Sequence, residues 1–278
     1  MLKKIIIVLR MVFILCAVFI IIGLYQFNEN IEKTEKLQEL KAHSSSALGN
    51  DSASVSTEAD LSRSGNSTSD NKTGSISDNS QIKEILPEYR ELYAINNDMV
   101  GWLKIDGTNI DYPVMRCNDG EYYLSHDFYK KEDKNGTPFV KSFADLDSPG
   151  DNFVVYAHNM KNGTMFGNLD DYENPVFADE HQIIEFDTLY EKRHYRIISV
   201  FRSEVYSEDA DNEDKFKYYQ FYNADTKEEF DHFYENIKSI SSYPSELAAS
   251  YGDKFITLST CAYHTNNGRF VVVGKEID

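Results

Sequence analysis

The chain has 278 residues, enough for one or two domains, and 41% of them are hydrophobic, which suffices for a folded core. Its net charge of −18 argues against a nucleic-acid partner, because phosphate binding needs clustered lysine and arginine. Three cysteines do not make a disulfide framework, although a bridge between Cys117 and Cys261 is conceivable.

Residues 1–26 predict a membrane anchor. Residues 5–24 are almost all apolar, and about 20 apolar residues span a bilayer. The one charge inside this stretch, Arg10, lies close enough to its end to reach the interface. Lys3 and Lys4 precede the stretch and acidic residues follow it, so the N-terminus is expected in the cytoplasm and the remainder outside the cell. A cleaved signal peptide is the competing interpretation, but no small-residue cleavage site follows the stretch.

Residues 27–80 are expected to separate this anchor from the rest of the chain. Residues 29–41 are charged and predict a short helix. Residues 43–80 are rich in Ser, Asn, Asp and Gly and nearly free of large apolar side chains, so they bury too little surface to fold. We therefore expect a flexible tether there.

Residues 81–278 are globular in composition and have the size of one domain. An apolar stripe at helical spacing opens the domain at residues 82–93, and Pro87 is expected to kink or restart that helix. Residues 102–114 predict a hairpin that turns at Asp106-Gly107. A second helix is expected over residues 224–240, where apolar side chains fall on one face.

Most of the remaining domain predicts strands. They are expected at residues 138–143, 152–158, 182–186, 194–201, 254–260 and 269–273. Asn-Gly pairs mark turns at residues 135–136, 162–163 and 267–268. The fold class we predict is mainly β: a closed or nearly closed β-barrel with an N-terminal helix and a helix inserted in a late strand connection.

Cys261 stands where an amphipathic strand ends, and Arg269 opens the next apolar run. If the two strands are antiparallel neighbours joined by residues 262–268, the two side chains lie nearly opposite, with Cβ atoms about 5 Å apart. A guanidinium beside the sulfur favours the thiolate and offers hydrogen-bond donors to an oxyanion. The alternative is a buried cysteine beside an ordinary surface arginine.

Thiol chemistry also needs a proton shuttle. His158 ends an apolar strand just before a loop, which is where a scaffold presents functional side chains. His264 is the main alternative, since it lies near the cysteine in sequence, although on a polar loop. The other histidines of the domain have less suitable settings: His126, His181, His194 and His232.

Two motifs resemble those of the sortase family, the membrane-anchored cysteine transpeptidases of Gram-positive bacteria. One is TLSTC followed by an arginine and an apolar strand, and the other is VVYAHNM with TMFGNL shortly after it. The resemblance covers residues 82–278, and the placement of the two helices is similar to class B. It implies Cys261 as nucleophile, His158 as acid/base and Arg269 as the oxyanion or substrate-positioning donor.

The same resemblance implies that Tyr156 and Ser259 line the substrate groove. Ala157 departs from the family motif, which usually has glycine between the tyrosine and the histidine. The added methyl group puts the fine geometry beside the histidine in question, and not the identity of the histidine.

A sortase cleaves an LPxTG or NPxTN sorting signal near the C-terminus of a secreted protein. It joins the acyl-enzyme threonine to an amine of a peptidoglycan precursor or a pilin. The resemblance implies no metal and no organic cofactor, and the acidic run at residues 207–214 reads as a solvated loop whose ion binding stays open. Two alternatives remain: an extracellular cysteine hydrolase, in which water resolves the thioester, and an anchored binding module, in which Cys261 is merely buried.

Overall fold

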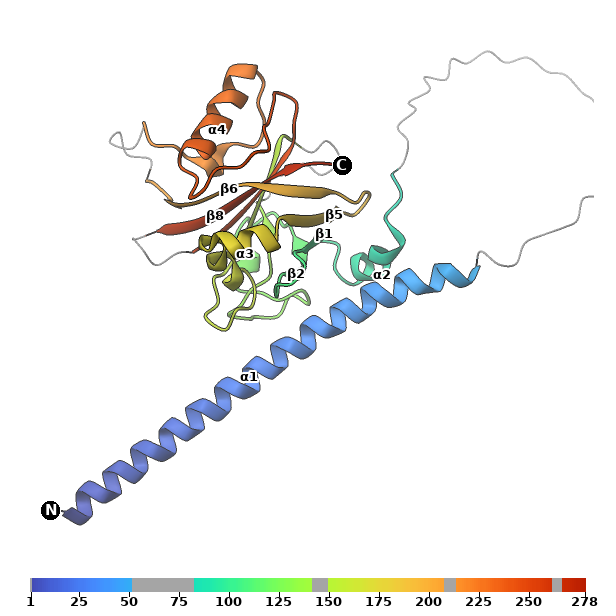
Figure 1. Cartoon of the computed structure of the whole chain (residues 1–278). Helices are drawn as coiled ribbons and strands as arrows, with labels where there is room; N and C mark the ends of the chain where they lie inside the picture. Colours follow the sequence, from blue (N-terminus) through green and yellow to red (C-terminus); the bar gives the residue numbers. More distant parts are fainter. Residues whose placement is uncertain (1, 52–82, 142–149, 208–213, 262–266) are drawn as a thin grey trace, which may run out of the picture.

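The structure, a computed structural model, describes residues 2–51, 83–141, 150–207, 214–261 and 267–278. They form one long N-terminal helix and a β-barrel that carries shorter helices (Figure 1). The helices are α1 (Leu2–Asp51), α2 (Pro87–Ile95), α3 (Pro175–Glu180) and α4 (Lys227–Ser239), with 3-10 turns η1 (Tyr122–Leu124), η2 (Gly167–Glu173) and η4 (Tyr218–Gln220). The strands are β1 (Met99–Lys104), β2 (Asp111–Met115), β3 (Phe139–Val140), β4 (Asn152–Ala157), β5 (Ile183–Thr188), β6 (His194–Glu204), β7 (Phe255–Cys261) and β8 (Gly268–Glu276).

In the described residues eight strands close a barrel in the order β1-β2-β3-β4-β7-β8-β6-β5. The ring closes because β1 pairs antiparallel with β2 on one side and with β5 on the other. Two neighbouring pairs, β2–β3 and β4–β7, are parallel, and the others are antiparallel. The predicted closed barrel is therefore confirmed.

Local sequence signals place several of these elements. The hairpin expected over residues 102–114 forms β1 and β2, and Gly107 adopts a φ of +78° at its turn, which glycine accepts without steric cost. Pro87 restarts the chain as a helix, since residues 83–86 are not helical and α2 begins at the proline.

Apolar side chains pack against both the inner and the outer face of the barrel sheet. Alternate residues such as Ile256 and Leu258 on β7 are fully buried in the interior. On the outside, α4 covers the face of the sheet near β6 and β8 with Phe230, Phe233 and Ile237, all buried (Figure 1). This helix is the one predicted over residues 224–240, and it lies in the connection between β6 and β7.

α1 is longer than the sequence predicts. One continuous helix carries the apolar stretch and also residues 43–51, which we expected to open the tether. Those residues contain no proline, so no strong helix breaker stops the continuation of the helix. Within the described residues α1 holds one segment long and apolar enough to cross a membrane, Leu9–Ser45, and its Phe13 and Phe19 side chains are 75% and 72% exposed. Residues 52–80 of the expected tether lie outside the described residues.

Other details depart from expectation as well. The strand predicted at residues 138–143 is reduced to β3, and its residues 142 and 143 lie outside the described residues. The helix α3 was not predicted, although Asn174 caps it by accepting from the Val176 N–H and Pro175 opens it. That Asn-Pro pair was a signal for the helix. Most of the acidic run, residues 208–213, also lies outside the described residues.

Candidate active site

The strand order brings residues that are distant in sequence to one edge of the barrel. β4 and β7 run parallel, so their carboxyl ends meet at the same edge, and the antiparallel β8 begins there. Cys261 is the last residue of β7 and lies opposite Arg269 in the β7–β8 ladder. His158 follows Ala157, the last residue of β4, which lies opposite Thr260. The predicted pairing of Cys261 with Arg269 is confirmed, and His158 joins it from the strand on the other side of β7.

The alternation of side chains relates these positions to one another. Tyr156 and His158 belong to one face of β4, and Ser259 lies opposite Tyr156 on β7. Cys261 is the next position of the same face of β7, and Arg269 is its partner on β8. Ile256 and Leu258, at the alternate positions of β7, pack in the barrel interior. The positions of Tyr156, His158, Ser259, Cys261 and Arg269 therefore belong to the outer face of the barrel.

His158 is oriented by a main-chain carbonyl. Its Nε2 atom lies 2.8 Å from the carbonyl oxygen of Leu124, in η1. A carbonyl only accepts hydrogen bonds, so Nε2 is the donor and the ring orientation follows. In nucleophile–base pairs a third group usually orients the base, and here the Leu124 carbonyl supplies that third group. The sequence motifs gave no sign of it, because any residue type carries such a carbonyl.

Arg269 is held in place by the start of its own strand. Its Nη1 atom donates to the carbonyl oxygens of Gly268, at 2.9 Å, and Asn267, at 3.2 Å. Burial raises the pKa of Tyr156 and Tyr218, and the positive charge of Arg269 opposes part of each rise. The positive charge of Arg269 thus acts on both phenols.

The two residues expected to line a substrate groove differ in exposure. Ser259 is only 1% exposed, and its hydroxyl lies 2.7 Å from the hydroxyl of Tyr218. Tyr156 is half-buried, stacks on Phe139 with 5.7 Å between ring centroids, and has the Lys141 ammonium 5.5 Å from its ring centroid. In this structure Ser259 is therefore buried against Tyr218. Contact of Ser259 or Tyr156 with a substrate stays a prediction.

The other histidines of the domain have different surroundings. His126 and His181 each stack on the aromatic ring four residues earlier, and each Nδ1 lies 2.8 Å from the carbonyl of that residue. The Nδ1 atom of His194 lies 3.0 Å from a carboxylate oxygen of the last residue, and His232 is exposed on α4. His264 lies outside the described residues, so His158 is the histidine that the described structure places at the edge with Cys261.

Cys117 is a free thiol and does not form the bridge to Cys261 that the sequence left conceivable. Its sulfur donates to the carbonyl oxygen of Asp119 at 2.7 Å. Burial and the nearby Asp98 carboxylate raise the pKa of the Cys117 thiol, which lowers its thiolate fraction at neutral pH. Among the described residues, no cluster of three or more His, Cys, Asp or Glu side chains has an arrangement that could hold a metal ion.

The part of the chain that forms the barrel is similar to known proteins. Residues 103–277 match the family described as Sortase domain, and the match includes both sequence motifs. The chain is 31% identical over 197 residues to Sortase B of Staphylococcus aureus (strain NCTC 8325 / PS 47), which covers 70% of this chain and 77% of that protein. It is similar to the structure of a Staphylococcus aureus sortase B–substrate complex, with a TM-score of 0.62, 30% identity and coverage of 70% of this chain and 87% of that chain. A structure of sortase B complexed with triglycine is similar too, with a TM-score of 0.62, 30% identity and coverage of 71% and 88%.

Proposed function

The chain belongs to the sortase family of cysteine transpeptidases and is most like class B, and on this premise we propose that it cleaves an LPxTG- or NPxTN-type sorting signal and joins it to an amine. One observation carries the proposal: Cys261 lies opposite Arg269 at the barrel edge where His158 directly follows β4, the parallel neighbour of β7. A nucleophile, a base with its own orienting acceptor and a cationic donor array are the groups that acyl transfer needs.

In the first step, the Cys261 thiolate attacks the carbonyl carbon of the signal's threonine. Arg269 donates hydrogen bonds to the oxygen that becomes negative in the tetrahedral intermediate. The carbon–nitrogen bond then breaks, and His158 gives its proton to the leaving amine. The signal is left as a thioester on the sulfur.

In the second step, His158 takes a proton from an incoming amine, which attacks the thioester and releases the thiolate. The acceptor we propose is an amine of a peptidoglycan precursor or a pilin. The triglycine complex of a similar sortase B supports an acceptor of this chemical kind. Water in place of the amine makes the same site a hydrolase.

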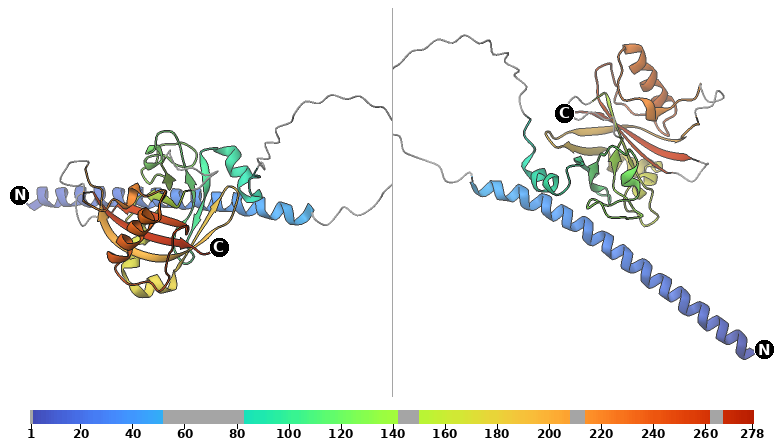
Figure 2. Two further views of the ribbon diagram at one scale, coloured as in Figure 1. Left: turned by 90° about the horizontal axis from the view of Figure 1, so that it is seen from above. Right: turned by 180° about the vertical axis from the view of Figure 1, so that it is seen from behind.

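We place residues 1–26 in the cell membrane as a single span, with the N-terminus cytoplasmic, and the domain from residue 81 outside the cell. The exposed apolar surface of α1 and the early Lys3 and Lys4 support this orientation. β8 ends near the C-terminus, on the side of the barrel away from the N-terminus of α1 (Figures 1 and 2). Because Arg269 lies near the beginning of β8, the candidate site lies on the side of the barrel toward the anchor, where secreted proteins emerge.

A transfer assay tests the proposal. The full-length chain in detergent micelles is incubated with a panel of LPxTG and NPxTN peptides, with and without triglycine, and the products are identified by mass spectrometry. We expect cleavage after the threonine and, with triglycine, a threonine–glycine conjugate that Cys261→Ala does not form. Cleavage that never yields a conjugate would support the cysteine hydrolase. Failure with every peptide, together with a Cys261 thiol that does not react with a methanethiosulfonate reagent, would support the binding module.

A further inference from the structure

Lys33 lies outside the residues matched by the Sortase domain, yet it contacts the barrel region. The second half of α1 runs alongside the barrel on the side of α2 (Figure 2). Leu37 on this half is only 7% exposed and belongs to the same buried cluster as Tyr89 and Trp102. One turn later the Lys41 ammonium lies 4.7 Å from the centroid of the Trp102 ring. α1 is thus docked on the domain by apolar and cation–π contacts.

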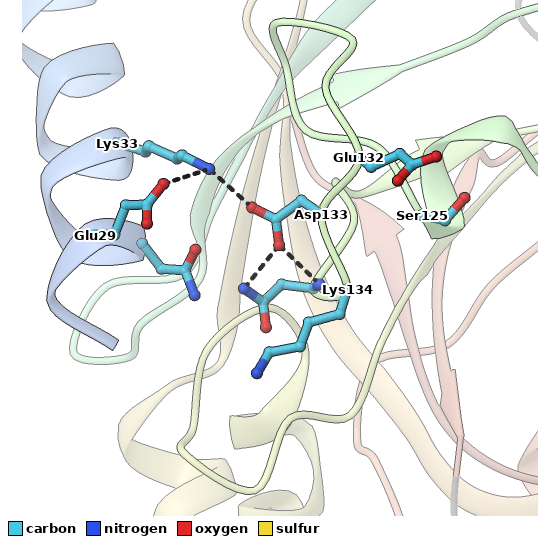
Figure 3. A pocket seen from close by; sticks show the side chains of 8 residues that line it. Glu29, Lys33, Ser125, Glu132, Asp133 and Lys134 are labelled. Carbon is cyan, nitrogen blue, oxygen red and sulfur yellow. Dashed lines mark hydrogen bonds and ion pairs between the residues drawn. The ribbon is translucent and has the colours of Figure 1, made fainter. Parts of the chain in front are cut away.

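A pair of carboxylates on one loop holds Lys33. Its Nζ atom lies 3.1 Å from Oδ2 of Asp133 (Figure 3) and 3.3 Å from Oδ2 of Asp127, and the side chains of these two aspartates are 11% and 9% exposed, respectively. The Oδ1 atom of each carboxylate accepts main-chain N–H groups of the same loop. Glu29, one turn earlier on α1, lies 3.5 Å from the same Nζ. Two largely buried carboxylates that share one cation repel each other when that cation is removed.

The loop that holds Lys33 also holds His158. The main-chain N–H of Asp133 donates to the carbonyl oxygen of Ser125 at 2.9 Å. The preceding carbonyl, that of Leu124, accepts from Nε2 of His158 at 2.8 Å. α1 is therefore connected to the Leu124 carbonyl, which accepts from His158, through one ion pair, one main-chain hydrogen bond and one peptide unit.

We propose that Lys33 is a positioning residue for His158. The ammonium bridges the two carboxylates and offsets their repulsion, this fixes the loop of residues 122–137, and the fixed loop holds the Leu124 carbonyl at the distance that orients the imidazole. The inference rests on the proposed acid/base role of His158. It makes the docked half of α1 a part of the working site, in addition to its connection to the membrane.

The test compares matched variants of the full-length chain in detergent micelles, with a sorting-signal peptide and triglycine as substrates. Lys33→Met removes the cation, Lys33→Arg keeps it, and Lys227→Met removes an exposed lysine that pairs with Asp231 on α4. We expect Lys33→Met to lower kcat about tenfold with little change in KM, because a misplaced base slows chemistry and not binding. Hydrogen exchange of residues 122–137 should also become faster. Lys33→Arg and Lys227→Met should stay within about twofold of the wild type.

Leu37→Ala undocks the helix without touching a charge, and it should reproduce the fall in kcat and the faster exchange. Faster loop exchange with unchanged kcat in Lys33→Met overturns the coupling to His158. Unchanged exchange in Lys33→Met overturns the role of Lys33 in holding the loop. If the wild-type chain processes no sorting signal, the proposed function fails, and the exchange comparison still decides whether Lys33 holds the loop.

Discussion

Cys261 and Arg269 are paired residues of the β7–β8 ladder, at the edge where the barrel ends. The arginine is not a loose surface side chain, because two carbonyls of its own strand entry hold one of its nitrogens. A guanidinium anchored in this way presents its donors from a fixed position. Preorganised donors of this kind stabilise the charge that develops in a tetrahedral intermediate.

Arg269→Lys keeps the charge and removes the planar array of donors. If Arg269 aims hydrogen bonds at the oxyanion, turnover should fall about 10²–10³-fold. The rate at which Cys261 is alkylated as a function of pH should change little, since the positive charge remains. Near-normal transpeptidation by the lysine variant would contradict a positioning role and leave only a charge effect.

Gly136→Ala should damage the support of His158. The φ of Gly136 is +62°, and a Cβ atom there would lie 2.4 Å from the Tyr123 oxygen and 2.7 Å from the Leu124 oxygen that accepts from the histidine. The Leu124 carbonyl has to move, so we expect kcat to fall at least about tenfold and the free energy of unfolding to drop by about 1–3 kcal/mol.

Gly252→Ala is the control for this substitution. Gly252 also has a positive φ, of +102°, but no atom lies within 4 Å of its added Cβ. Its cost is limited to backbone strain, so stability falls while kcat is retained. Urea unfolding and steady-state kinetics on both variants make the comparison. Equal kcat values for the two variants would argue that the Leu124 carbonyl does not matter to turnover.

Tyr218→Phe removes a hydroxyl that is bonded to Ser259 in a fully buried setting. The Ser259 hydroxyl then loses that partner, and we expect the free energy of unfolding to fall by about 1–2 kcal/mol. Tyr251→Phe is the control, because that exposed hydroxyl makes a 3.3 Å contact and should cost less than about 0.5 kcal/mol. Chemical denaturation measures both, and equal losses would show that the buried pair has no special weight.

The two cysteines of the domain should differ in reactivity with pH. The pKa of Cys117 is raised, so its thiolate fraction is small at neutral pH and grows as the pH increases. We expect slow iodoacetamide labelling of Cys117 at pH 7 that accelerates at higher pH, and faster labelling of Cys261 at pH 7. Cys117→Ala should leave transpeptidation nearly unchanged, whereas Cys261→Ala abolishes it. Comparable losses in both variants would indicate a shared structural role.

Short-range signals predicted much of this fold. The Asp106-Gly107 turn located the first hairpin, and apolar side chains on one face located α4. α4 begins at Lys227, directly after Thr226, whose side chain caps the helix by accepting from the Glu229 N–H. The pairing of Cys261 with Arg269 was predictable because one short connection joins their strands. In each case the residues that decide the geometry are neighbours in the sequence.

The rest depends on contacts between distant segments. The parallel pairing of β4 with β7, which brings His158 level with Cys261, follows from closure of the whole barrel and leaves no local pattern. The docking of Leu37 and Lys33 on the domain was hidden as well, because residues 29–41 predict a charged helix and their sequence does not show which surface that helix contacts. The Leu124 carbonyl leaves no sequence signal either, because every residue type carries a main-chain carbonyl.

Mapping of the acyl-enzyme tests the central claim most directly. The full-length chain is incubated with a cleavable sorting-signal peptide in the absence of an amine, quenched in acid and digested, and the modified residue is located by tandem mass spectrometry. We expect the mass of the threonine-terminated fragment on Cys261 as a thioester that disappears when triglycine is added. Cleavage of the peptide with no adduct on Cys261, or with the adduct on Cys117, would contradict the account.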